Sequence, residues 1–157
     1  MEELILRDAE ISDISILVNL IHDAFSQYQG KLDPPSGANK ETLQTIGLKI
    51  NEGGAIIAEK NKKAIGCALW KKDSDSLYMG RLAVLPEYRK LGIGNTLIEM
   101  VERKACILGY NKVIVGVRLA IPKLVDYYLK RGYTISEYCY HVGYKEPTYV
   151  RMIKQLN

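Results

Sequence analysis

LAVLPEYRKLGIG, at residues 82–94, is the most informative segment of this chain. A short apolar run ends at a proline, the basic pair Arg89-Lys90 follows, and two glycines stand at Gly92 and Gly94. A helix-type apolar pattern then continues over residues 95–108. This order predicts a strand, a tight loop and a helix N-terminus, where unpaired backbone N–H groups and the helix dipole favour an anion. We therefore predict a phosphate-binding loop, with the basic pair as mobile positive charge at its rim.

The spacing of the glycines separates this loop from two commoner phosphate-binding loops. A Walker loop has a lysine directly after its last glycine, where this chain has Asn95. A dinucleotide-binding loop has a third glycine three residues after the second, where this chain has Leu97. A plain packing turn would also use glycines, but it would not need Arg89-Lys90. The pattern therefore favours a phosphate loop of a third kind.

The pattern Arg-x-x-Gly-x-Gly after a strand resembles the pyrophosphate loop of the GNAT family, the GCN5-related N-acetyltransferases. The resemblance implies an acetyl-CoA-dependent acyltransferase that moves an acetyl group directly to a primary amine of a small molecule or protein, in a ternary complex. It also implies a strand that carries a bulge, splays from its neighbour and pairs through its backbone with pantetheine. The cofactor-binding residues that it implies are Leu82, Ala83, Val84, Arg89, Lys90, Leu91, Gly92, Ile93, Gly94 and Asn95.

A second segment is similar to the same family. Tyr128 stands four residues before the pair Gly132-Tyr133, as in the family's last helix. Helical periodicity places Tyr128 on the apolar face and Tyr127 toward its edge, as a packing residue. The resemblance gives Tyr128 the catalytic role of protonating the leaving thiolate, and a core tyrosine without a catalytic role is the alternative. Ile121 stands where many family members have an asparagine, so this chain departs from the family in its proton relay.

The general base and the acceptor amine are not identified by the sequence. Glu87 lies in the loop and Glu137 on a late strand, and both are interpreted as surface carboxylates. His141 could titrate near neutral pH but is interpreted as structural. By the resemblance, the loop at residues 28–37 covers the acceptor site. No acidic cluster marks a polyamine or peptide-amine site.

The order of predicted elements along the chain is β-α-α-β-β-β-α-β-α-β-β. The predicted strands lie at 4–6, 55–59, 64–70, 77–85, 112–117, 133–139 and 148–153. The predicted helices run from Ser12 or Asp13 to Phe25, over 43–50, over 95–108, and from Pro122 to Gly132. Hairpins mixed with crossover helices predict an α+β, three-layer fold in which helices flank a mixed, splayed central sheet. The length of 157 residues predicts a single domain, 1–157.

The composition is that of an ordinary globular protein, with 47% hydrophobic residues, 25% charged residues and a net charge of +4. The basic residues form no stripe, so we expect no nucleic-acid partner, and no apolar run is long enough for a membrane span. Cys67, Cys106 and Cys139 have no metal-ligand spacing, which predicts reduced thiols and no metal. The acidic N-terminus is unlike a signal peptide. We therefore predict a cytoplasmic protein, as a monomer or homodimer.

Two other functions remain open from the sequence. A non-catalytic acyl-CoA-binding or regulatory module would keep the cofactor cleft without the acid-base chemistry, and Ile121 is the observation in its favour. A nucleic-acid or protein interaction domain has only the mild positive charge to support it.

Overall fold

The computed structural model describes residues 3–156, and its elements follow the predicted order. The strands are β1 (Leu4–Asp8), β2 (Gly53–Lys60), β3 (Lys63–Asp73), β4 (Ser76–Val84), β5 (Lys112–Arg118), β6 (Thr134–Cys139) and β7 (Tyr149–Gln155). The α-helices are α1 (Ile14–Phe25), α2 (Leu43–Glu52), α3 (Ile93–Ile107) and α4 (Pro122–Leu129). Met1, Glu2 and Asn157 belong to the predicted domain but lie outside the described residues.

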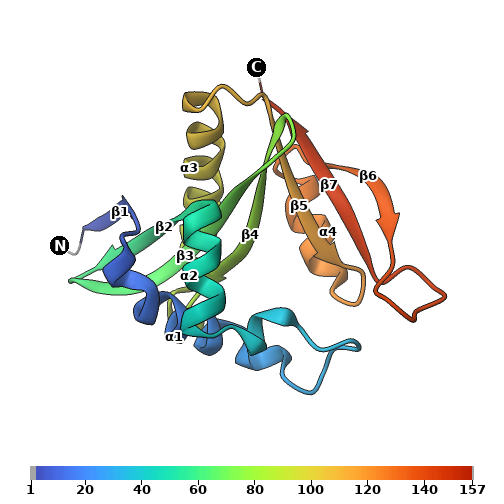
Figure 1. The fold of residues 1–157 in the computed structure, drawn as a ribbon, viewed down its shortest axis with the longest axis horizontal. Helices are drawn as coiled ribbons and strands as arrows, with labels where there is room; N and C mark the ends of the chain where they lie inside the picture. The colour runs from blue at the N-terminus through green and yellow to red at the C-terminus, as the bar shows by residue number, and fades with distance from the viewer. Residues whose placement is uncertain (1–2, 157) are drawn as a thin grey trace.

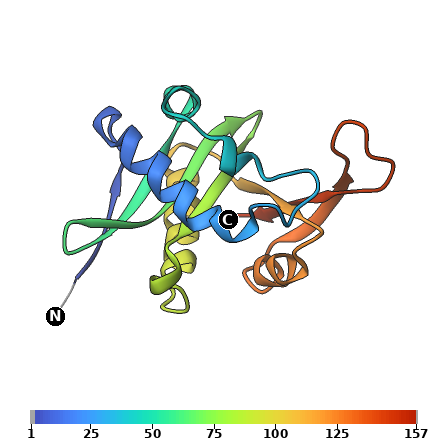
Figure 2. The same ribbon diagram turned by 90° about the horizontal axis from the view of Figure 1, so that it is seen from below.

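The strands form one mixed sheet in the order β1-β2-β3-β4-β5-β7-β6. Neighbouring strands are antiparallel except for β4 and β5, which are parallel. Helices α1 and α2 cover one face of the sheet, and α3 and α4 cover the other (Figures 1 and 2). The mixed sheet between two helical layers confirms the predicted fold class.

Local signals in the sequence explain where the helices begin and end. The α2 helix begins at a capping box in which Thr42 and Thr45 each accept a backbone N–H of the other. Pro122 occupies the first turn of α4, where its missing N–H costs nothing. Gly109 follows α3 with a φ of +89°, the left-handed conformation of a helix C-terminus.

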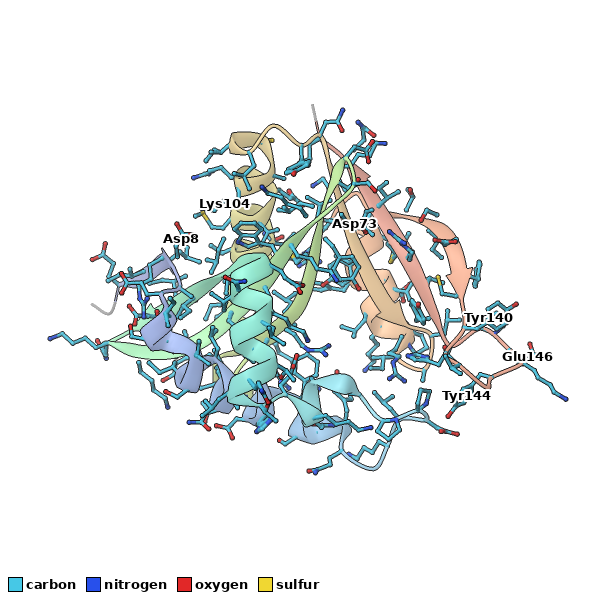
Figure 3. The ribbon with its side chains drawn as sticks, viewed as in Figure 1. Asp8, Asp73, Lys104, Tyr140, Tyr144 and Glu146 are labelled. Atoms are coloured by element: carbon cyan, nitrogen blue, oxygen red, sulfur yellow. The ribbon has the colours of Figure 1, made fainter. Side chains whose placement is uncertain are left out.

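The apolar face of α3 packs against the sheet largely as predicted. Leu97, Ile98, Val101 and Ala105 are buried. Leu108 was expected on the same face but is 41% exposed, because the helix ends at Ile107 and Leu108 is already its C-cap. On the sheet side, Lys104 forms an ion pair with Asp8 at 3.0 Å, which ties α3 to β1 (Figure 3).

A β-bulge interrupts the pairing of β3 with β4. Cys67 pairs with Ala83 and Leu69 pairs with Gly80. The two pairs are therefore two residues apart along β3 but three residues apart along β4. The bulge contains Arg81, which adopts a φ of +48°. A bulge of this kind bends the strand and redirects its side chains. The bulge implied by the family resemblance is therefore present, immediately before the apolar run that leads into the loop.

Beyond the bulge, β4 and β5 separate. Their pairing is confined to residues 77–79 of β4 and 113–115 of β5, although the strands continue to Val84 and Arg118. Figure 1 shows the two strands meeting at one end and diverging toward the other. The result is a fork in the middle of the sheet, which is the splay that the resemblance implied.

Candidate active site

The fork holds a cavity of about 800 Å³, and most of the predicted site residues line it. Those on its wall are Leu82, Ala83, Val84, Arg89, Lys90, Gly92, Ile93, Gly94, Asn95 and Tyr128. Leu91 is the predicted residue that the fold does not bring there, because its side chain points outward and is 61% exposed. Two segments more than 30 residues apart in the sequence thus meet at one site.

The N-terminus of α3 is shaped to receive an anion. Gly92 is the N-cap with a φ of +81°, and no side chain caps the helix. The N–H groups of the first turn, from Ile93 to Asn95, therefore remain available to a ligand. Lys90 precedes this turn with a φ of +66°. An uncapped helix N-terminus beside a cation fits a diphosphate group such as that of coenzyme A.

Arg89 is fixed within the protein, which contradicts its expected role as a mobile rim charge. Its Nε donates to the carbonyl oxygen of Val84 at 3.0 Å, and its Nη2 donates to the carbonyl oxygen of Ala24 at 2.8 Å. Its Nη1 also donates to the side chain of Gln27. Arg89 therefore joins the end of β4 to the C-terminal end of α1, where a cation is favoured by the helix dipole.

Arg131 is a residue of the site that sequence reasoning missed. Its Nε donates to Oδ1 of Asn95 at 3.0 Å, and its Nη1 donates to the carbonyl oxygen of Tyr127 at 2.8 Å. Its guanidinium stacks on the Tyr127 ring, with 3.4 Å between Cζ and the ring centroid. Arg131, which follows the C-terminal end of α4, therefore brings a positive charge to the first turn of α3. The available signal was the spacing of four residues between Tyr127 and Arg131 at a helix end.

Tyr128 is almost fully buried and lines the cavity. Its ring makes edge contacts with Tyr127 and Tyr133, with centroids 5.5 and 5.4 Å apart. Within residues 3–156, its hydroxyl has no hydrogen-bond partner. Burial raises the pKa of the Tyr128 phenol far above its usual value, so the hydroxyl keeps its proton at neutral pH.

Polar contacts hold Tyr133, whose ring packs against Tyr128. The hydroxyl of Tyr133 donates to Oε2 of Glu102 at 2.9 Å, and Lys154 pairs with the same carboxylate at 3.1 Å. These contacts join α3, the end of α4 and β7. Tyr128 therefore packs against a tyrosine that is itself held by polar contacts.

At the other end of the cavity, Arg81 projects from the bulge toward the segment between α1 and α2. Its Nε donates to Oε2 of the buried Glu41 at 2.7 Å. Glu41 also pairs with Lys49 and accepts the hydroxyl of Thr45 at 2.7 Å. Burial raises the pKa of Glu41, but the hydrogen bonds from these three partners outweigh it and hold the pKa below its usual value. Glu41 is therefore a carboxylate with two cationic partners.

Arg118 stands at the end of β5, across the fork from Arg81. Its Nη1 and Nη2 donate to the carbonyl oxygens of Pro34 and Pro35 at 2.7 and 3.1 Å. No carboxylate of the described chain lies within ion-pair distance of it. Burial and the nearby charge of Arg81 lower its pKa.

His141 lines the same end of the cavity. Its backbone N–H donates to the hydroxyl of Thr148 at 3.0 Å, and its Nδ1 contacts the same hydroxyl. Its ring lies 5.0 Å from the ring of Tyr149, centroid to centroid. Burial and the charge of Arg118 lower the pKa of His141, so the imidazole is neutral at pH 7.

Two loops meet beside this end of the cavity. The hydroxyl of Tyr144, in the loop between β6 and β7, donates to Asp33 in the loop between α1 and α2. Figure 3 shows Tyr144 in its loop, on the side that faces the α1–α2 loop. With the Arg118 contacts, this hydrogen bond connects three segments around the predicted acceptor end.

The charge on the cavity wall is one-sided. The cationic side chains that line it are Arg81, Arg89, Lys90, Arg118 and Arg131, and no Asp or Glu of the described residues is part of its lining. Glu87 and Glu137 lie outside the lining, in agreement with their interpretation as surface carboxylates. His141 was interpreted as structural, yet it is the lining residue that titrates closest to neutral pH.

Comparison with known proteins points to one family. The model of the acetyltransferase (GNAT) family matches residues 17–133. The S-alkylcysteine N-acetyltransferase of Bacillus subtilis (strain 168) is 28% identical over 145 residues, which cover 86% of this chain and 81% of that protein. The amino-acid acetyltransferase of Pasteurella multocida (strain Pm70) is also 28% identical, over 84% of this chain but only 27% of that protein.

Solved structures show the same fold. PaiA N-acetyltransferase from Thermoplasma acidophilum, crystallised in complex with coenzyme A, superposes with a TM-score of 0.78. The match covers 98% of this chain and 99% of that one, at 18% sequence identity. The ribosomal-protein-S18-alanine N-acetyltransferase of Escherichia coli gives a TM-score of 0.79 at 14% identity, over 98% of this chain and 94% of that one.

Proposed function

Because the chain belongs to the acetyltransferase (GNAT) family, we propose that it transfers an acetyl group from acetyl-CoA to the primary amine of a small molecule. The family membership confirms the predicted resemblance, acyltransferase activity and acetyl donor. Both sequence relatives are named as acetyltransferases of amino acids, which supports a small acceptor and does not favour the non-catalytic module.

The observation that carries the proposal is that one cavity is lined both by the N-terminus of α3 and by Tyr128. We propose that the first-turn N–H groups of α3 bind the diphosphate, with Lys90 and Arg131 supplying positive charge. The unpaired inner edge of β4, at Leu82 to Val84, offers main-chain groups to pantetheine. Acetyl-CoA bound in this way supplies the thioester that is attacked.

Three groups of the chain then serve the transfer. Main-chain N–H groups of β4 that face the cavity polarise the thioester carbonyl as negative charge develops on its oxygen. Tyr128 donates its proton to the departing sulfur. The raised pKa of Tyr128 keeps its phenol protonated until that step. The walls of the fork hold amine and thioester together, which replaces a bimolecular step by an effectively unimolecular one.

The amine must lose a proton before or during its attack. No carboxylate of the described residues lines the cavity, so a glutamate base from the wall is not supported. We propose that His141 accepts this proton, directly or through water. Its lowered pKa leaves the imidazole neutral at pH 7, the form that can act as a base.

The proposal is tested by thiol release. The protein is mixed with acetyl-CoA and a panel of primary amines, and free coenzyme A is measured with a thiol reagent. Amine-dependent release supports the proposed function. Cofactor binding without release from any amine contradicts it and restores the non-catalytic alternative.

The cellular setting and assembly remain as the sequence predicted them. No helix in residues 3–156 is long and apolar enough to cross a membrane. Cys67, Cys106 and Cys139 are free cysteines. We propose a cytoplasmic location, as predicted from the sequence. We propose a monomer or homodimer, which sedimentation analysis distinguishes.

A further inference from the structure

We propose that the acceptor carries a carboxylate beside its amine, and that Arg81 and Arg118 bind this carboxylate. The inference rests on the proposed function and names the substrate class of the same site. It concerns the end of the cavity opposite the diphosphate loop. The acceptor that it describes is a free amino acid.

The two arginines stand on opposite sides of the fork. Met79 and Val115 form the last pair between β4 and β5. Arg81 lies two residues beyond Met79, and Arg118 lies three residues beyond Val115. Both side chains contact the segment between α1 and α2, and both line the cavity. Burial and the charge of Arg81 both lower the pKa of Arg118.

The negative charge beside this pair does not balance its positive charge. Glu41 is the carboxylate partner of Arg81, but it also pairs with Lys49, so the three side chains together keep a charge of +1. Arg118 binds two backbone carbonyls and no carboxylate of the described residues. Tyr144 and Asp33, which are hydrogen-bonded to each other, are the acidic groups that raise the pKa of Arg118, and they do not outweigh its burial. Partly buried cations without compensation are unfavourable, and a bound anion would relieve this cost.

The hydrogen bonds already formed leave suitable donors free for such an anion. Arg81 uses its Nε for Glu41, and within residues 3–156 its two terminal nitrogens have no hydrogen-bond partner. Arg118 uses one hydrogen of each terminal nitrogen for a carbonyl oxygen. Guanidinium groups bind carboxylates through pairs of N–H donors, more tightly than they bind neutral groups. The remaining donors therefore suit a carboxylate.

The rest of this end of the cavity argues against other amine classes. A polyamine would bring positive charge to a wall that holds arginines and no carboxylate. The Tyr144–Asp33 contact and the Arg118–Pro34 contact connect the bordering loops, which favours a small molecule over a folded protein. Apolar and aromatic side chains complete the lining at Phe25, Tyr28, Leu32 and Tyr149. We therefore expect an amino acid with an apolar side chain.

The test compares amino acids with their own amides, which keep the amine and lose the carboxylate. L-leucine, L-methionine, S-methyl-L-cysteine and their amides are titrated calorimetrically into the full chain saturated with coenzyme A. We expect at least one acid to bind about 10- to 100-fold more tightly than its amide, because a charge-assisted pair is lost in the amide. Equal binding of every acid and its amide, or no binding of either, overturns the inference.

Matched variants test whether Arg118 binds the carboxylate. Arg118→Gln is expected to reduce acid binding to the level of the amide and leave amide binding within about twofold. Arg118→Lys, which keeps the charge, is expected to retain part of the preference. Arg103→Gln removes an exposed arginine of α3 and should change neither. Coenzyme A binding, measured first, shows that each variant is folded. A preference that survives in Arg118→Gln contradicts the proposed site.

Two further measurements separate this inference from the proposed function. Acid binding that depends on Arg118 but gives no thiol release with acetyl-CoA supports the carboxylate site and contradicts the transferase. Thiol release that is equally fast with acids and amides supports the transferase and overturns the carboxylate site. O-phosphoethanolamine is the third probe, and tighter binding of this phosphate than of every acid would also overturn the proposal.

Discussion

The hydroxyl oxygen of Tyr127 lies 2.8 Å from the point that a Cβ atom on Gly94 would occupy. Gly94 belongs to the first turn of α3 and Tyr127 to α4, so this contact joins the diphosphate loop to the helix that carries Tyr128. The stacked guanidinium of Arg131 covers the same tyrosine ring. A side chain at position 94 would therefore disturb both the loop backbone and the neighbouring cation.

We expect Gly94→Val to reduce coenzyme A affinity more than tenfold while the protein still folds. The added side chain blocks the approach of a diphosphate to the backbone and collides with Tyr127. Normal binding by a folded Gly94→Val protein would show that the diphosphate lies elsewhere. The double variant Gly94→Ala with Tyr127→Phe is the sharper control, because it removes the hydroxyl that a methyl group would meet. Its fold should be near normal and its cofactor binding still weakened.

Arg89 and Lys90 are adjacent basic residues with different expected roles. Arg89→Ala removes hydrogen bonds to the carbonyls of Ala24 and Val84, so we expect it to destabilise the ligand-free protein by about 1–3 kcal/mol. Lys90→Ala should leave ligand-free stability unchanged and weaken coenzyme A binding. Denaturant unfolding with and without coenzyme A measures both effects. The same stability loss in both variants would contradict the distinction.

For Tyr128→Phe we expect kcat to fall by about 10²- to 10⁴-fold or somewhat less, with little change in the dissociation constant of acetyl-CoA. The ring and its contacts with Tyr127 and Tyr133 remain, while the proton donor is lost. Tyr127→Phe removes a phenol from the adjacent position of the same helix and should be nearly silent. Steady-state kinetics on both variants make the comparison. If Tyr127→Phe is the damaging change, the acid has been assigned to the wrong tyrosine.

The pH dependence of kcat/KM for the acceptor should follow the protonation of His141. Because its pKa lies below the usual 6.5, the neutral imidazole predominates at pH 7, and activity should be lost only as pH falls through that lowered pKa. We expect kcat/KM for the acceptor to decline with a slope of one at acid pH. Arg118, Tyr144 and Tyr149 surround the ring, and none of them is expected to change charge in this range. His141→Gln should lower kcat/KM and remove this decline. An unchanged pH profile would show that His141 is not the base.

The order of elements and the strand–loop–helix arrangement around Gly92 were predictable from the sequence because their signals are local. Pro122 and Gly109 are local signals of a helix start and a helix end, and both were confirmed. The apolar periodicity of α3 was confirmed except at Leu108. The ends of strands were less certain, since backbone pairing continues through exposed residues that carry no apolar signal. β1, for example, extends to Asp8, two residues beyond its last apolar residue.

The acceptor end could not be predicted because its contacts join residues that are remote in the sequence. Arg81 meets Glu41 across 40 positions, and Arg118 meets Pro34 across 84. The bulge that turns Arg81 toward Glu41 depends on a positive φ at a residue type that rarely adopts one. Arg89 was misjudged for the same reason, since its partner Ala24 is 65 positions away.

The short pairing of β4 with β5 gives the sheet two edges in its interior. From Gly80 to Val84 on one side and from Gly116 to Arg118 on the other, the strands face the cavity without pairing to each other. An open strand edge is a template for any extended chain, including one from another copy of the same protein. Pantetheine bound along β4 would occupy this template. Bound cosubstrate would then also protect the strand edge from pairing with other chains. The protein without coenzyme A would be the form most prone to aggregate.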